Sequence, residues 1–77
     1  MNTLTSAFED RGYRWAYRTV NSLLAEARTA ETMPWPPVNA GLYRTLFPQL
    51  TYWLPEEEGA LLRFEFEIEI ARLDAAA

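Results

Sequence analysis

The sequence contains no cysteine and no histidine. Without cysteine the chain has no disulfide framework and no thiolate site. Without either residue it lacks the side chains that usually hold zinc, haem and iron–sulfur clusters. The commonest general base and the Ser–His and Cys–His nucleophile pairs are excluded as well. We therefore expect a protein that is not an enzyme and that holds no metal ion and no cofactor.

Lysine is also absent, so the 7 basic residues are all arginines, and 11 acidic residues give a net charge of −4. An acidic chain is poorly suited to binding nucleic acid directly. No apolar run approaches the ~20 residues that cross a bilayer. The first residues lack the basic and then apolar pattern of a secretory signal. These features predict a cytoplasmic protein that contacts neither nucleic acid nor membrane.

The length of 77 residues, with 49% hydrophobic and 14% aromatic residues, predicts one small domain with a compact core. Chains of this size bury only about 60–65% of their unfolded surface, so their stability is marginal. Small domains often gain stability from a second copy or a partner. A homodimer or a bound partner protein is therefore expected.

The first half of the chain is typical of a helix, over about residues 6–31. Ser6 and Glu9 have the spacing of a capping box at a helix start. Gly12 costs about 1 kcal/mol inside a helix, which leaves a later start after Gly12 as an alternative. Apolar residues that recur at helical spacing predict the core-facing side. They are Tyr13, Ala16, Tyr17, Val20, Leu23, Leu24, Ala27 and Ala30.

A proline-rich connector follows, over residues 32–38, in extended polyproline-like geometry. Trp35 within it is expected to plug the core; presentation as a ligand is the alternative. Asn39 is a candidate cap for a short helix over about residues 39–47, which should end before Pro48. A strand over residues 42–47 is the alternative there.

The last third, about residues 49–73, is predicted to form an antiparallel β-hairpin. Residues 63–70 read RFEFEIEI, in which apolar residues and glutamates alternate strictly. On a strand the apolar residues form one row, whereas on a helix they scatter around the axis. A helix that starts at Pro55 with an acidic first turn is the alternative. The period favours the strand, and the fold class is then α+β, with a long N-terminal helix, a short second helix and a C-terminal hairpin packed on the helices.

This hairpin would gather six carboxylates on one acidic face. Glu65, Glu67 and Glu69 would project from one strand about 6.5–7 Å apart. They would not converge on a Mg²⁺ or Ca²⁺ ion, because a flat strand keeps its side chains apart. The face is either a solvated surface or a docking surface for a basic partner, similar to a row of phosphates. Its six residues are Glu56, Glu57, Glu58, Glu65, Glu67 and Glu69.

A basic face is expected on the first helix, opposite its core-facing side. Arg11, Arg14 and Arg18 have helical spacing, with Trp15 beside them. Arginine and tryptophan are frequent anchors of protein interfaces. The alternative is that these arginines pair with Glu9, with Asp10 or with the hairpin glutamates of the same molecule. A surface with both signs of charge would also permit self-association.

In its size, its acidic charge and its lack of catalytic residues, the chain resembles the small anti-defence inhibitors of phages and mobile elements, such as anti-CRISPR proteins. The resemblance implies a non-enzymatic inhibitor in the cytoplasm of a bacterial host. Such an inhibitor would use the acidic face to occlude a basic, nucleic-acid-binding surface of a defence complex. The alternative is a structural or assembly subunit, or a homodimeric accessory protein, that uses the Arg/Trp face of the first helix.

Overall fold

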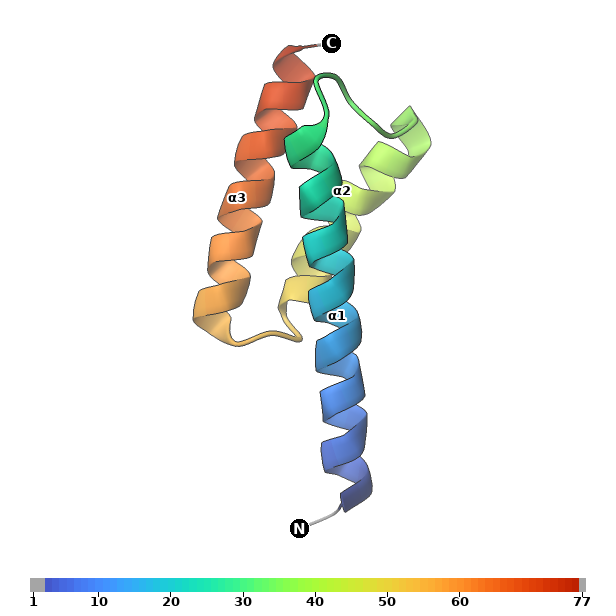
Figure 1. Ribbon diagram of the computed structural model, residues 1–77, viewed down its shortest axis with the longest axis vertical. Helices are drawn as coiled ribbons and strands as arrows, with labels where there is room; N and C mark the ends of the chain where they lie inside the picture. Colours follow the sequence, from blue (N-terminus) through green and yellow to red (C-terminus); the bar gives the residue numbers. More distant parts are fainter. Residues whose placement is uncertain (1–2, 77) are drawn as a thin grey trace.

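The computed structural model describes the backbone of residues 3–76 and the side chains of residues 12–76. It contains three helices: α1 (Thr3–Thr29), α2 (Pro37–Thr51) and α3 (Glu56–Ala75). Each helix packs on both of the others, and the N-terminal part of α1 extends beyond α2 and α3 (Figure 1). Residues 3–76 contain no strand, so the α+β prediction is wrong and the described part of the chain is all-helical.

The C-terminal hairpin is the main error, because residues 49–51 close α2 and residues 56–73 lie in α3. The alternation RFEFEIEI was read as one apolar face of a strand. On α3 it instead produces two apolar faces on opposite sides of the helix, at about 100° per residue. The rejected alternative, a helix start after Pro55 with three glutamates in its first turn, is what the structure has.

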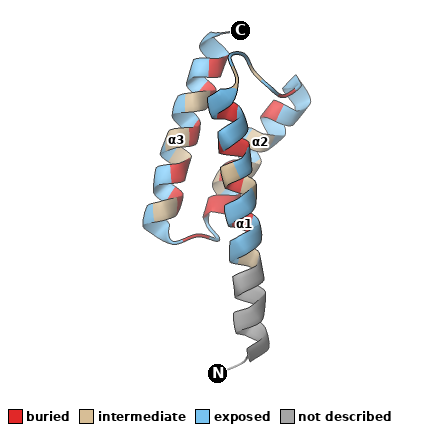
Figure 2. Ribbon diagram, in the orientation of Figure 1, coloured by how far each residue is buried: buried red, intermediate tan, exposed pale blue. Residues whose placement is uncertain are grey.

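The inner face of α3 closes the core and the outer face does not. Leu62, Phe66, Ile70 and Leu73 follow one another at i, i+4, i+8 and i+11 and are all buried. Leu61, Phe64 and Ile68 lie on the opposite side and remain 57%, 61% and 49% exposed. Figure 2 shows the buried positions of α3 on the side that faces the other helices.

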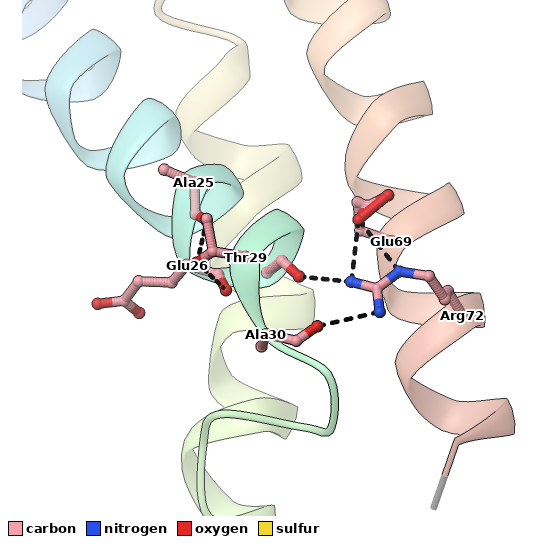
Figure 3. A network of polar contacts seen from close by, with 7 residues as sticks. Ala25, Glu26, Thr29, Ala30, Glu69 and Arg72 are labelled. Atoms are coloured by element: carbon pink, nitrogen blue, oxygen red, sulfur yellow. Dashed lines mark hydrogen bonds and ion pairs between the residues drawn. The ribbon is translucent and has the colours of Figure 1, made fainter.

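Two polar flanks separate these faces, and each flank bonds to a neighbouring helix. On the α1 side, Arg72 donates to the carbonyl oxygen of Ala30 at 3.0 Å (Figure 3). It also donates to the carbonyl oxygen of Ala27 at 2.7 Å. On the α2 side, Arg63 donates to the hydroxyl of Thr51 at 2.7 Å. The flanks therefore fix which face of α3 turns inward, although the helix is apolar on both faces.

Helix α2 is longer than the predicted helix over residues 39–47. It starts after Pro36, with Pro37 in its first turn. Proline is tolerated there because the backbone N–H that it lacks would have no acceptor within the helix. Asn39 therefore lies inside the helix and does not cap it. The helix also continues through Pro48, which was expected to end it. Burial of Phe47 and Leu50 on either side of Pro48 offsets the lost backbone hydrogen bond.

Helix α1 spans Thr3–Thr29, whereas residues 6–31 were predicted. Ser6 and Glu9 lie inside it, so they do not form a capping box at its start; their side chains fall outside the described ones. The helix also passes through Gly12 without a break. A Cβ atom at this position would lie 2.6 Å from Cε3 of Trp53, so the lack of a side chain at Gly12 leaves room for the indole ring of Trp53.

The core-facing side of α1 is narrower than predicted. Ala16, Val20 and Ala27 are fully buried, together with Leu23 and Leu24 nearby. Tyr13 and Tyr17, which were expected in the core, are 37% and 44% exposed and stack on each other at 6.0 Å between ring centroids. They lie at the edge of the buried face.

Aromatic residues from three different segments form the centre of the core. Phe47 of α2 and Phe66 of α3 stack with ring centroids 3.9 Å apart and planes at 4°. Trp35 from the connector is buried, and its ring meets Tyr43 edge-on at 5.0 Å. Its indole N–H donates to the Glu26 carboxylate at 2.6 Å. The prediction that Trp35 plugs the core is confirmed.

Within residues 3–76, no helix combines the length and the apolar composition that crossing a membrane requires.

Candidate protein-interaction surface

The six glutamates of the predicted acidic face do not form one row, because α3 turns them to different sides. Glu65 pairs with Arg28 of α1 at 2.6 Å, and Glu69 pairs with Arg72 at 3.1 Å. Glu67 lies on the opposite flank, beside α2. Among residues 12–76, no three carboxylates gather closely enough to hold a metal ion. Because residues 56–75 are helical, the strand-like array of glutamates is wrong.

Glu56, Glu57 and Glu58 occupy the first turn of α3, where the positive end of the helix dipole stabilises negative charge. Glu58 lies near the Tyr13 hydroxyl of α1. Partial burial raises the pKa of the Tyr13 hydroxyl, and the Glu58 carboxylate raises this pKa further. Glu58 is thus drawn towards α1, whereas Glu56 and Glu57 are exposed at the start of the helix.

The structure describes the side chains of three residues of the predicted basic face, and these three lie together on α1. Arg14, Trp15 and Arg18 are exposed on the side opposite the core and line a shallow hollow with Thr19. The side chain of Arg11 lies outside the described ones. The ion pairs among residues 12–76 use other arginines, so pairing of this face with the α3 glutamates is not seen.

The most distinctive surface is the outer face of α3, which we call the outer stripe. It consists of Leu61, Phe64, Ile68, Ala71 and Ala75, at i, i+3, i+7, i+10 and i+14. All five residues are exposed. This is the spacing of the contact seam between two packed helices. A line of large apolar side chains open to water is uncommon on a soluble domain unless another molecule covers it.

Two carboxylates border the outer stripe without an ion-pair partner among the described side chains. Glu57 lies in line with the stripe, one turn before Leu61, and Glu67 lies on its α2 side. The nearby arginines have other partners: Arg28 pairs with Glu65, and Arg44 pairs with Asp74. No ion pair among residues 12–76 includes Glu57 or Glu67. Both carboxylates therefore lie outside the ion pairs of the described side chains.

A groove between α2 and α3 opens beside the outer stripe. Its volume is about 330 Å³, at the lower end for ligand-binding clefts. Ala71 belongs to both the groove and the stripe, so the two features form one continuous surface. The other lining residues are the apolar Phe47, Pro48, Phe66 and Ile70, and the charged Arg44, Arg63, Glu67 and Asp74.

Sequence reasoning missed the outer stripe because it placed Phe64 and Ile68 in one buried row with Phe66 and Ile70. A signal was available. Leu61 and Leu62 are adjacent, which breaks the alternation, and each starts its own series at helical spacing. Two such series on opposite sides predict a helix that is covered on both faces.

Comparison with known proteins gives no match: no protein-family model, no curated protein and no solved structure is similar to this chain. The function of this chain is therefore inferred from the geometry of its own residues.

Proposed function

We propose that this chain is a non-enzymatic protein-binding protein, and that its contact surface is the outer stripe of α3. One observation carries the proposal. Leu61, Phe64 and Ile68 are 57%, 61% and 49% exposed along one line of a helix whose opposite face already closes the core. The fold does not need these side chains, so a partner is the physical reason for an apolar line at this place.

The occupant that fits this line is a helix of another protein. The stripe from Leu61 to Ala75 covers 14 helical steps, or about 21 Å at 1.5 Å per residue. An amphipathic helix of similar length can lay its own apolar line against it, in the manner of helix-in-groove recognition. A flat or loop-shaped partner would cover the stripe less completely.

A contact surface on α3 is compatible with an inhibitor that acts by occlusion, as the sequence led us to expect. Of the acidic residues, Glu56, Glu57 and Glu67 stay available around the stripe, while Glu65 and Glu69 are engaged in ion pairs. A partner bound to α3 could not use the part of its own surface that α3 covers. The resemblance to anti-CRISPR proteins, and a basic defence complex as the target, remain predictions.

A structural or assembly subunit is the second candidate function. The observation that favours it is Trp15, which is 55% exposed between Arg14 and Arg18 on α1. Tryptophan and arginine are the residues most enriched at interface hot spots. This surface lies on a different helix from the outer stripe, so substitutions separate the two candidates.

Site-specific photo-crosslinking tests the proposal. A photoreactive phenylalanine analogue replaces Phe64 in one sample and Leu42 in another, because Leu42 is also apolar and 57% exposed but lies on α2. Both proteins are irradiated in extract from the source cells. We expect one protein adduct from position 64, lost with Ile68→Asp and reproduced with the purified partner, and none from position 42. No adduct at 64, or equal adducts at both positions, overturns the proposal.

A further inference from the structure

We infer that the occupant of the outer stripe is a basic amphipathic helix that places one large apolar side chain in the groove between α2 and α3. The inference depends on the proposed function, because it names the chemistry of the partner for the same surface. Three observations lead to it: the two carboxylates outside the described ion pairs, the change of side-chain size along the stripe, and the apolar floor of the groove.

The carboxylates select the charge of the partner. Glu57 and Glu67 border the stripe, and no ion pair among residues 12–76 includes either of them. A partner with arginine or lysine beside its apolar line can pair with them as it docks. Opposite charges at an interface favour association and orientation, whereas like charges oppose them.

The same carboxylates argue against a second copy as the occupant. Two copies joined through their outer stripes would bring two sets of Glu57 and Glu67 to one seam, between chains that each carry a net charge of −4. The arginines closest to the stripe keep their positive charge, but they are held against the neighbouring helices. Arg72 already donates to Ala27 and Ala30, and Arg63 donates to Thr51.

Side-chain size along the stripe locates the anchor. The stripe is bulky at Leu61, Phe64 and Ile68 and then becomes small at Ala71. Ala71 is also part of the groove lining, so the short side chain leaves the groove open towards the stripe. A partner helix that lies along the stripe can therefore place one large side chain beside Ala71, where the groove leaves room for it.

The groove suits an apolar anchor at this position. Its floor is made by Phe47, Pro48, Phe66 and Ile70, and its volume is about 330 Å³. Interfaces concentrate their binding energy in aromatic side chains that fill such pockets. Glu67 lies at the rim and can accept a hydrogen bond from an indole N–H or from a neighbouring cation. The preferred anchor is thus tryptophan, with arginine or lysine near it.

Two synthetic peptides provide the probe. Each has about 18 residues, enough for five helical turns, with leucines along one face and one tryptophan at the centre of that face. The residues beside the apolar face are arginines in the first peptide and glutamates in the second. Binding to the full chain is measured by isothermal titration calorimetry, and the contact is mapped by amide chemical shifts in NMR spectra.

We expect the arginine peptide to bind at least about tenfold more tightly than the glutamate peptide, a difference that one or two charge contacts supply. Its shift changes should fall on residues 60–75 of α3 and on residues 44–48 of α2. Glu67→Lys should weaken binding about tenfold or more. The matched control Glu31→Lys changes an exposed glutamate in the connector and should leave the affinity unchanged.

The groove is tested separately from the charge. Ala71→Trp fills the opening with the protein's own side chain and should weaken the arginine peptide, as should replacement of the peptide tryptophan by alanine. An unchanged affinity in both cases overturns the anchor. Equal affinity for the two peptides, or none for the arginine peptide, overturns the basic partner.

Failure here can be told apart from failure of the proposed function. If position 64 still crosslinks to one partner while the arginine peptide does not bind, the stripe is an interface for a helix of other chemistry. If the chain forms a dimer that Phe64→Asp converts to monomers, the occupant is a second copy and the inference is wrong. If neither crosslink nor peptide binding occurs, both are wrong.

Discussion

The guanidinium of Arg72 in α3 caps the carboxyl end of α1 by donating to the carbonyl oxygen of Ala27 at 2.7 Å. It also donates to Ala30 at 3.0 Å and is held by Glu69 at 3.1 Å (Figure 3). Carbonyl oxygens in the last turn of a helix have no partner within the helix. A cation at this end is also favoured by the helix dipole. The side chain of Arg72 thus links α3 to the carboxyl end of α1.

Removal of this cap should cost more than removal of a surface ion pair. Arg72→Leu should lower the free energy of unfolding by about 1–2 kcal/mol, because carbonyl oxygens lose charged donors. Arg28→Leu is the matched control, since it breaks only the exposed pair with Glu65 and should cost less than about 1 kcal/mol. Urea denaturation followed by circular dichroism measures both. Equal losses would show that the cap contributes no more than an ordinary surface pair.

The two phenylalanines of the alternating segment should respond very differently to truncation. Phe66 is 4% exposed and stacks on Phe47, so Phe66→Ala should destabilise the fold by about 3–5 kcal/mol. Phe64 is 61% exposed, so Phe64→Ala should change the unfolding free energy by less than about 1 kcal/mol. Thermal and urea denaturation of both variants checks this. Losses of similar size would favour the single buried row of a strand.

The glycines of α2 and α3 should respond to alanine with opposite signs. A Cβ atom at Gly59 would lie 2.7 Å from the backbone oxygen of Thr51, which cannot move aside easily. Gly59→Ala should therefore destabilise the protein by about 1–3 kcal/mol. Gly41 has no atom within 4 Å of that position, so Gly41→Ala should stabilise the protein by about 0.5–1 kcal/mol through helix propensity. A shift of both melting temperatures in one direction would contradict this packing.

Tyr13 should ionise at a higher pH than a free tyrosine, whose pKa is about 10. Its neutral form is favoured in the fold, by partial burial first and by the Glu58 carboxylate second. The contribution of Tyr13 to the free energy of unfolding is therefore fully present below about pH 10, and it is lost as the pH rises through the raised pKa of Tyr13. Spectrophotometric titration should show the raised pKa of Tyr13 disappear with Tyr13→Phe and fall with Glu58→Gln. An unchanged titration curve in both variants would contradict this environment.

The sequence predicted α1 and the position of Trp35 because each depends on one dominant signal. A single apolar stripe of helical spacing marks α1, and Ala16, Val20 and Ala27 on that stripe are fully buried. Trp35 is a large apolar residue in a rigid connector, and the core covers it. Both signals are local in the sequence, although the burial of Trp35 itself comes from its contacts with Tyr43 and Phe66.

Helix α3 was mispredicted because its two apolar faces cancel in any search for a single one. Residues 63–70 satisfy a period of two and, together with Leu61 and Leu62, also satisfy two helical series. Tertiary contacts then decide, because Arg63 and Arg72 bond to α2 and α1 only when the segment is helical. Pro48 was mispredicted for a similar reason, since burial of its neighbours outweighs the local cost of proline in a helix.

The candidate site was predicted only where it depends on α1. Arg14, Trp15 and Arg18 lie together on the exposed side, as their spacing implied. The six glutamates were placed on one face because their predicted arrangement followed the period of a strand. Phe64 and Ile68 of the outer stripe were assigned to the buried face of the hairpin, because an apolar residue in a small domain is normally expected to be buried.

Solvent paramagnetic relaxation of side-chain methyl groups tests the two-faced helix most directly. In a dilute sample with a soluble gadolinium complex, the methyl signals of Leu61 and Ile68 should broaden strongly, while those of Leu62 and Ile70 should be protected. The Cα chemical shifts of residues 56–75 should be helical throughout. Equal protection of all four residues, or extended Cα shifts over residues 60–72, would contradict an open outer stripe and the binding role proposed for it.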